Sequence, residues 1–202
     1  MKKAFSILEL IIVISLITVV TSISFPKLNI SKLQLATDKM IIYLNFTRYI
    51  SMLDNKHDID DVEWEKKRWT LKFQRCSNAE DGLYFVVYSD QSGGTAHFKK
   101  SETLKDPLNN KYLYSGYDCK ANKNESPDVL LTKKYGIQDI IISCNTTSTI
   151  GQISFGYGGK IYSQLGTNIK EIEQPCSIKL VDNQDKESVI IVEANTGYIH
   201  KQ

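Results

Sequence analysis

The sequence predicts an α+β protein in which a long N-terminal helix, transmembrane in its first half and amphipathic in its second, packs on an antiparallel β-sheet head. Three observations predict this class. An apolar run opens the chain, a helical hydrophobic period follows it, and short strand-like segments fill the remainder of the 202 residues. The expected divisions are a leader at residues 1–4, a transmembrane helix at 5–25, its amphipathic continuation at 26–53 and a β-rich globular head at 54–202.

The apolar run extends from Phe5 to Phe25 and, as a helix, would be about 31 Å long, close to the hydrocarbon thickness of a bilayer. Lys2 and Lys3 precede it, so the positive-inside rule places the N-terminus in the cytoplasm and the rest of the chain outside. Glu9 interrupts the run, where an ionised carboxylate costs about 2.5 to 3.5 kcal/mol. A charge kept at this position needs a partner.

The stretch K-K-A-F-S-I-L-E-L-I-I-V-I resembles the type IV prepilin signal, in which a basic leader ending in a small residue is cut before phenylalanine. The resemblance implies cleavage between Ala4 and Phe5, N-methylation of Phe5, and an assembly role for Glu9, fifth in the mature chain. Ala4 replaces the glycine usual in the family. The new amino group would pair with a neighbouring copy's Glu9, so both charges are neutralised only in the polymer. Pro26 stands where pilins commonly carry a helix-perturbing proline, so we expect a kink or a locally melted helix there.

Two other interpretations of this segment stay open. Residues 1–24 could be a cleaved secretory signal, because Ser22-Ile23-Ser24 offers a small-x-small site, although the apolar run exceeds the about 7–15 residues that such a core needs. Alternatively, the run is a plain anchor whose Glu9 snorkels to the membrane surface.

Beyond Pro26, apolar residues recur at steps of three and four from about Ser31 to Leu53, which predicts an amphipathic helix. The polar stretch from Asp54 to Lys67 has no apolar period and predicts a loop. Short segments rich in β-branched and aromatic residues then predict an antiparallel β head. These segments are Arg68–Gln74, Gly82–Tyr88, Lys111–Tyr114, Gln138–Ser143, Gln152–Phe155, Lys160–Tyr162, Cys176–Val181, Ser188–Glu193 and Gly197–His200.

Two further stretches resemble the H-type (FimT-like) minor pseudopilins of type II secretion. They are L-N-F-T-R-Y-I-S-M, which ends the predicted helix, and the closing strands from I-S-F-G-Y-G-G-K to E-A-N-T-G-Y-I. The resemblance implies a pilin-like fold and a subunit that joins or primes a filament in a type II secretion, type IV pilus or DNA-uptake (competence) system. It also implies an inner-membrane position, with a periplasmic head.

The four cysteines, Cys76, Cys119, Cys144 and Cys176, have no C-x-x-C spacing that would suit zinc. An even number in a chain expected to be exported favours two disulfides, for which three pairings are possible. Four unrelated buried thiols remain the alternative.

No recognisable nucleophilic set surrounds the three histidines, so we expect neither an enzyme nor a cofactor. Asp182, Asp185 and Glu187 are the best calcium candidates, although acidic residues this close together more often form a solvated hairpin loop. Gly156-Tyr157-Gly158-Gly159-Lys160 lacks the spacing of a phosphate-binding loop and predicts a hairpin turn.

Lys2 and Lys3 account for the whole net charge of +2, so the mature chain would be neutral and gives no electrostatic reason to expect direct nucleic-acid binding, although the head of a competence subunit could contact DNA. The partners implied are a prepilin peptidase, sibling pilins packed through residues 5–53, and the inner-membrane assembly platform. The competing hypothesis is an exported β-rich binding protein or enzyme on a single membrane anchor.

Overall fold

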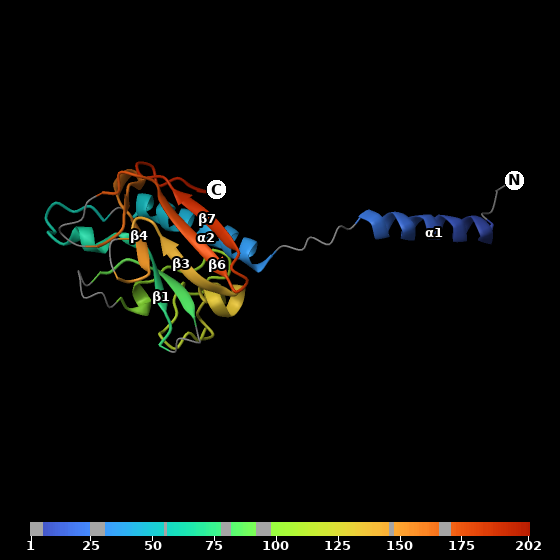
Figure 1. Cartoon of the computed structure of the whole chain (residues 1–202), viewed down its shortest axis with the longest axis horizontal. Coiled ribbons are helices and arrows are strands. Elements are labelled where there is room, and N and C mark those ends of the chain that lie inside the picture. The colour runs from blue at the N-terminus through green and yellow to red at the C-terminus, as the bar shows by residue number, and fades with distance from the viewer. Residues whose placement is uncertain are drawn as a thin grey trace. The chain divides into compact units, whose positions relative to one another are not determined.

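The computed structural model describes residues 6–24, 31–54, 56–77, 82–91, 98–145, 148–165 and 171–202 (Figure 1). The chain divides into two compact units, Met1–Ile30 and Ser31–Gln202. The predicted cleavage site at Ala4 and Phe5 and the predicted kink at Pro26 lie outside the described residues.

The first unit contains helix α1 (Ile7–Ser24), which has 18 residues and carries Glu9 in its first turn. At about 1.5 Å per residue the helix is roughly 27 Å long, shorter than the ~30 Å hydrocarbon core of a bilayer. Within the part of the chain that the structure describes, no helix is both long and apolar enough to cross a membrane. The predicted transmembrane helix at residues 5–25, and with it the single-pass inner-membrane position and periplasmic head, is therefore wrong.

Helix α2 (Lys32–Leu53) has an N-terminus of its own. Ser31 is extended, and its Oγ accepts a hydrogen bond of 3.1 Å from the Gln34 N–H, which makes it the N-cap. One long helix continuing from the apolar run is therefore a wrong prediction, because the extended backbone at Ser31 interrupts any such continuation. The predicted α+β class is corrected as well, since the chain is mostly β with two antiparallel sheets.

In its described residues, the second unit holds α2, eight strands and several short helical turns. The strands are β1 (Trp69–Arg75), β2 (Leu83–Tyr88), β3 (Ile137–Ile142), β4 (Gly151–Phe155), β5 (Ile161–Tyr162), β6 (Cys176–Asp182), β7 (Glu187–Val192) and β8 (Ile199–Lys201). The described turns of helix are η1 (Trp64–Lys67), η3 (Lys100–Glu102), η4 (Pro127–Val129), η5 (Leu131–Tyr135) and η6 (Tyr157–Gly159).

Each sheet has four strands, in the orders β2-β1-β4-β5 and β3-β6-β7-β8. All of the pairings are antiparallel. In the first sheet Phe73 of β1 lies between Phe85 of β2 and Gly151 of β4. In the second, Ile178 of β6 lies between Ile142 of β3 and Ile190 of β7. β3 is thus an edge strand of its sheet, and β1 has no β4 partner beyond Phe73.

Helix α2 supplies one side of the core and packs against strands of both sheets (Figure 1). Leu33, Ala36, Met40 and Leu44 are buried on one helical face, at the three- and four-residue steps that the sequence predicts. Burying a large apolar side chain of this kind contributes about 1.5–3 kcal/mol. The amphipathic pattern therefore reports a real packing face.

Arg48 of α2 joins the glycine turn predicted at residues 156–160 to a second turn at Gly197. Its Nε donates a 2.8 Å hydrogen bond to the Thr196 carbonyl. Gly159 and Gly197 lie beside Arg48 and have φ values of 84° and 60°. A Cβ on Gly197 would come within 2.3 Å of the Gly159 carbonyl oxygen, so both the backbone conformation and the close approach require glycine.

Strands form at every predicted segment except one. Lys111–Tyr114 makes only isolated bridges, in which Tyr112 pairs with Lys105 and with Glu125. The predicted loop from Asp54 to Lys67 includes the single helical turn η1.

Candidate functional site

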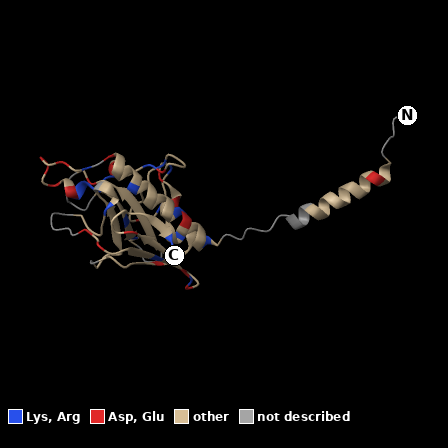
Figure 2. Cartoon of the chain, turned by 90° about the horizontal axis from the view of Figure 1, so that it is seen from above, with Lys and Arg blue, Asp and Glu red and all other residues tan. Residues whose placement is uncertain are grey.

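The surface of α1 is apolar all round. Eleven large apolar side chains between Ile7 and Val20 are exposed, from Val13 at 47% to Ile7 at 79%. Glu9 is the only charged residue of this helix, as Figure 2 shows near its N-terminal end. A helix that is hydrophobic on every face is normally covered by other protein or by lipid, so α1 is a candidate interaction surface.

Glu9 has a partner within its own chain. The Ser6 backbone N–H donates to Glu9 Oε2 at 3.0 Å, and the Glu9 N–H donates to Ser6 Oγ at 3.3 Å. This reciprocal pair is a capping box, which satisfies two of the free N–H groups at a helix start. A negative charge at this position also interacts favourably with the positive end of the helix dipole. Glu9 is therefore held at the N-terminus of α1 without a second copy of the chain.

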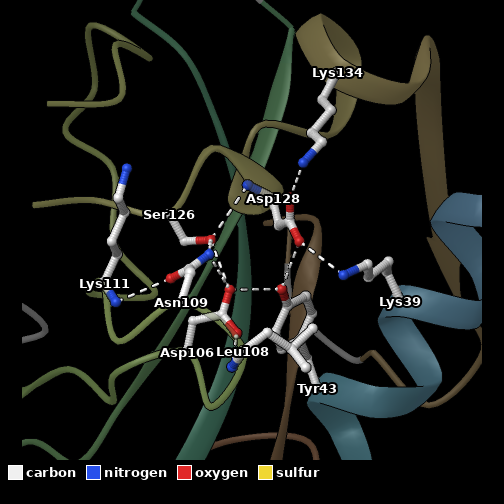
Figure 3. A network of polar contacts seen from close by, with 9 residues as sticks. All are labelled: Lys39, Tyr43, Asp106, Leu108, Asn109, Lys111, Ser126, Asp128 and Lys134. Atoms are coloured by element: carbon white, nitrogen blue, oxygen red, sulfur yellow. Dashed lines mark hydrogen bonds and ion pairs between the residues drawn. The ribbon is translucent and has the colours of Figure 1, made fainter. Parts of the chain in front are cut away.

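A second cluster of polar side chains lies inside the head, where α2 meets the loop that follows β2 (Figure 3). The Tyr43 hydroxyl lies 2.9 Å from Asp106 Oδ2 and 2.9 Å from Asp128 Oδ2, and the three residues are at most 5% exposed. Since a phenol has one proton, Tyr43 donates to one carboxylate at a time. Burial, followed by the charge of Asp106, raises the pKa of Tyr43 and keeps its proton in place.

Each carboxylate has further donors. Asp128 pairs with the ammonium groups of Lys39, at 3.1 Å, and Lys134. Asp106 accepts hydrogen bonds from the Leu108 N–H at 2.9 Å, from Asn109 Nδ2 at 2.8 Å and from Ser126 Oγ at 2.8 Å.

These contacts bind α2 to two loops of the head, and none of the described cavities is lined by Tyr43 or by either aspartate. The cluster is a buried support for the fold. No local pattern in the sequence indicates Tyr43 as the partner of these two aspartates.

The four cysteines form two disulfides, Cys76–Cys119 and Cys144–Cys176. The prediction of two disulfides is thus confirmed, and the structure selects one pairing of the three.

The acidic residues considered for calcium lie at the turn between β6 and β7. Asp182 Oδ1 accepts hydrogen bonds from the Gln184 and Lys186 N–H groups at 2.8 and 3.0 Å, and Glu187 pairs with Lys179 at 2.8 Å. Asp185 has a φ of 57°, a conformation typical of a tight turn. Among the described residues no cluster of three His, Cys, Asp or Glu side chains could hold a metal ion. The carboxylates of Asp182 and Glu187 therefore serve the hairpin.

Comparisons with protein families, with curated proteins and with solved structures find no match to this chain. The residues and their geometry are therefore the basis for assigning a function.

Proposed function

We propose that this chain is a subunit of a pilin-like filament, in which copies pack through α1 and display the disulfide-bonded head. The apolar surface of α1 carries the proposal. Its exposed side chains form a continuous hydrophobic surface with no amphipathic division, so several neighbouring helices can pack around it at once. A filament core made of many copies provides such neighbours.

The prepilin-like signal supports the same function. Cleavage after Ala4 would create an amino group at Phe5, four residues before Glu9. Burial of Glu9 among apolar helices would favour a partner of opposite charge, and the Phe5 amino group of an adjacent copy would provide one. The subunit then acts by assembly, without catalysis. Type II secretion, pilus and DNA-uptake systems all use filaments of this kind, and a minor or priming subunit suits each of them.

Photo-crosslinking tests the packing surface. A photoreactive residue at Ile11, which is 63% exposed on α1, should yield a ladder of self-crosslinked copies. The matched control is Ile59 in the head, which is 88% exposed and should yield no ladder. Equal crosslinking at both positions, or none at Ile11, contradicts packing through α1.

Intact mass tests the processing. Loss of Met1 to Ala4 together with the gain of one methyl group is the expected result. Loss of residues 1–24 would instead identify a secretory signal, and an unprocessed mass would favour the exported binding protein or enzyme.

A further inference from the structure

A groove of about 650 Å³ lies between the C-terminal half of β1 and the edge strand β3. β4 pairs with β1 only as far as Phe73, and β3 pairs with β6 alone. Phe73, Arg75, Ile140 and Ile142 all border the groove. In the described part of the chain, the groove is thus bounded by two strands that have no strand partner on that side.

Among the described residues, both borders present backbone groups that no neighbouring strand pairs, although the Ile142 carbonyl accepts a 3.2 Å hydrogen bond from the Asn145 N–H. Hydrogen-bonded residues alternate along an antiparallel ladder, and the Ser143 N–H bonds to the Ser177 carbonyl of the β6 side, so Ile140 and Ile142 direct their backbone groups away from β6. By the same alternation, the bond from the Cys76 N–H to the Gly82 carbonyl directs the backbone groups of Arg75 away from β2. Free edges of this kind accept an added strand.

The side chains that line the groove lie on two faces of the bordering strands, one buried and one more exposed. Phe73, Ile140 and Ile142 are at most 6% exposed, whereas Ile141, between the last two, is 51% exposed. Lys72 precedes Phe73 in β1, so its side chain lies on the opposite face of the strand, and it also lines the groove. An inserted strand would therefore place alternate side chains against an apolar face and against the face that carries Lys72.

The charge of the groove is positive. Of the described residues that line it, Lys72 and Arg75 are basic and none is acidic. Arg75 already pairs with Asp139 at 3.2 Å, while the Lys72 ammonium has no hydrogen-bond or ion-pair partner in the described part of the chain. Burial lowers the pKa of Lys72, as expected for a cation that lacks a counter-charge. A carboxylate on the incoming strand would supply that charge.

Both disulfides hold the borders of the groove. Cys76 follows Arg75 directly and is bonded to Cys119, close to the groove residue Tyr117. Cys144 lies between the groove residues Ile142 and Asn145 and is bonded to Cys176 at the start of β6. A groove with covalently fixed borders needs little reorganisation to accept a ligand.

We propose that this groove binds an extended peptide segment of another protein, with alternating apolar and acidic residues, which adds as a strand to β3 and neutralises Lys72. This inference goes beyond filament assembly, because it concerns the head and does not depend on α1. It gives the displayed head a ligand class: exposed acidic strands or tails.

The test uses full-length protein and a fluorescein-labelled heptapeptide of alternating valine and glutamate, followed by fluorescence anisotropy. Saturable binding is expected, and Lys72→Glu should weaken it on the order of tenfold or more, whereas the matched control Lys186→Glu, in the exposed β6–β7 turn, should leave it unchanged. A peptide of alternating valine and lysine should not bind.

Two measurements on the unaltered protein keep the test decisive if Lys72→Glu does not fold. N-methylation of the peptide backbone should weaken binding by on the order of tenfold, because it removes donors to the β3 edge. Hydrogen exchange should slow at Ile140 and Ile142 when the unmethylated peptide binds. Absence of binding, equal binding of the lysine peptide, indifference to N-methylation, or slowed exchange only outside β3 would each overturn the proposal.

Discussion

Substitution of Ser6 and Glu9 separates two roles that the structure allows for the glutamate. In the capping box, Glu9 needs only a hydrogen-bond acceptor for the Ser6 N–H, and glutamine provides one. In the filament, Glu9 needs its negative charge to pair with the amino group of Phe5 from a neighbouring copy. Glu9→Gln therefore keeps the cap and removes the pairing, while Ser6→Ala weakens the cap and keeps the charge.

The expected magnitudes differ enough to be distinguished. Loss of a capping side chain costs about 0.5–2 kcal/mol, and loss of a charge at a helix N-terminus about 0.3–1 kcal/mol. Loss of one partner of a buried ion pair costs about 3–5 kcal/mol, because the other charge stays buried alone. At about 1.4 kcal/mol per tenfold, Glu9→Gln should raise the concentration needed for assembly by at least ~100-fold, and Ser6→Ala by roughly 2- to 30-fold.

Sedimentation of processed protein after dilution of detergent measures the assembled fraction over a range of concentrations. Circular dichroism of the same samples reports whether α1 is still helical. Assembly of Glu9→Gln at the wild-type concentration would refute the charge-pairing model, as would an equal loss in Ser6→Ala. In either case the glutamate would serve the helix start alone.

Three predictions concern the stability of the head, measured by urea unfolding. Tyr43→Phe leaves two buried carboxylates without a shared donor and should lower the free energy of unfolding by about 2–3 kcal/mol. Burial raises the pKa of Glu125, but hydrogen bonds led by that from Lys100 outweigh burial and hold the pKa below 4.5. Glu125→Gln should therefore lower the free energy of unfolding by about 2 kcal/mol at neutral pH. The stability curves of the wild type and the variant should converge as the pH falls below 4.5. Ser31→Ala should cost about 1 kcal/mol and Ser31→Asp almost nothing, because aspartate keeps the cap of α2.

Local periodicity predicted much of the head correctly. β-branched and aromatic residues indicated eight of the strand segments, and the apolar steps from Leu33 to Leu44 indicated the buried face of α2. These signals are reliable because a strand or a helix must bury its own apolar side chains, wherever its partner comes from in the chain. The even number of cysteines indicated two disulfides for a similarly general reason, while the choice of partners depended on the fold.

Contacts between distant residues could not be predicted in the same way. Tyr43 meets Asp106 and Asp128 across 63 and 85 residues, and no pattern in the sequence connects them.

The wrong prediction of one long N-terminal helix has another cause. Apolar content and helical period continue on both sides of Pro26, but only local signals such as the Ser31 cap mark a new helix start. The capping box of Ser6 and Glu9 is visible in the sequence as S-x-x-E, although the same glutamate also fits the prepilin pattern.

The proposed assembly surface and the proposed peptide site lie in different compact units of the chain. α1 belongs to one compact unit, and the head, in the other, closes its own core with α2 and two sheets. The disulfides close loops with sequence separations of 43 and 32 residues and so stabilise the head by about 4 kcal/mol each in the chain-entropy account, while they also hold the borders of the β1–β3 groove. A head stabilised in this way can keep an open strand edge that a less constrained sheet would close by rearrangement. Substitutions in α1 should therefore change how copies associate, and substitutions around Lys72 should change what the head binds.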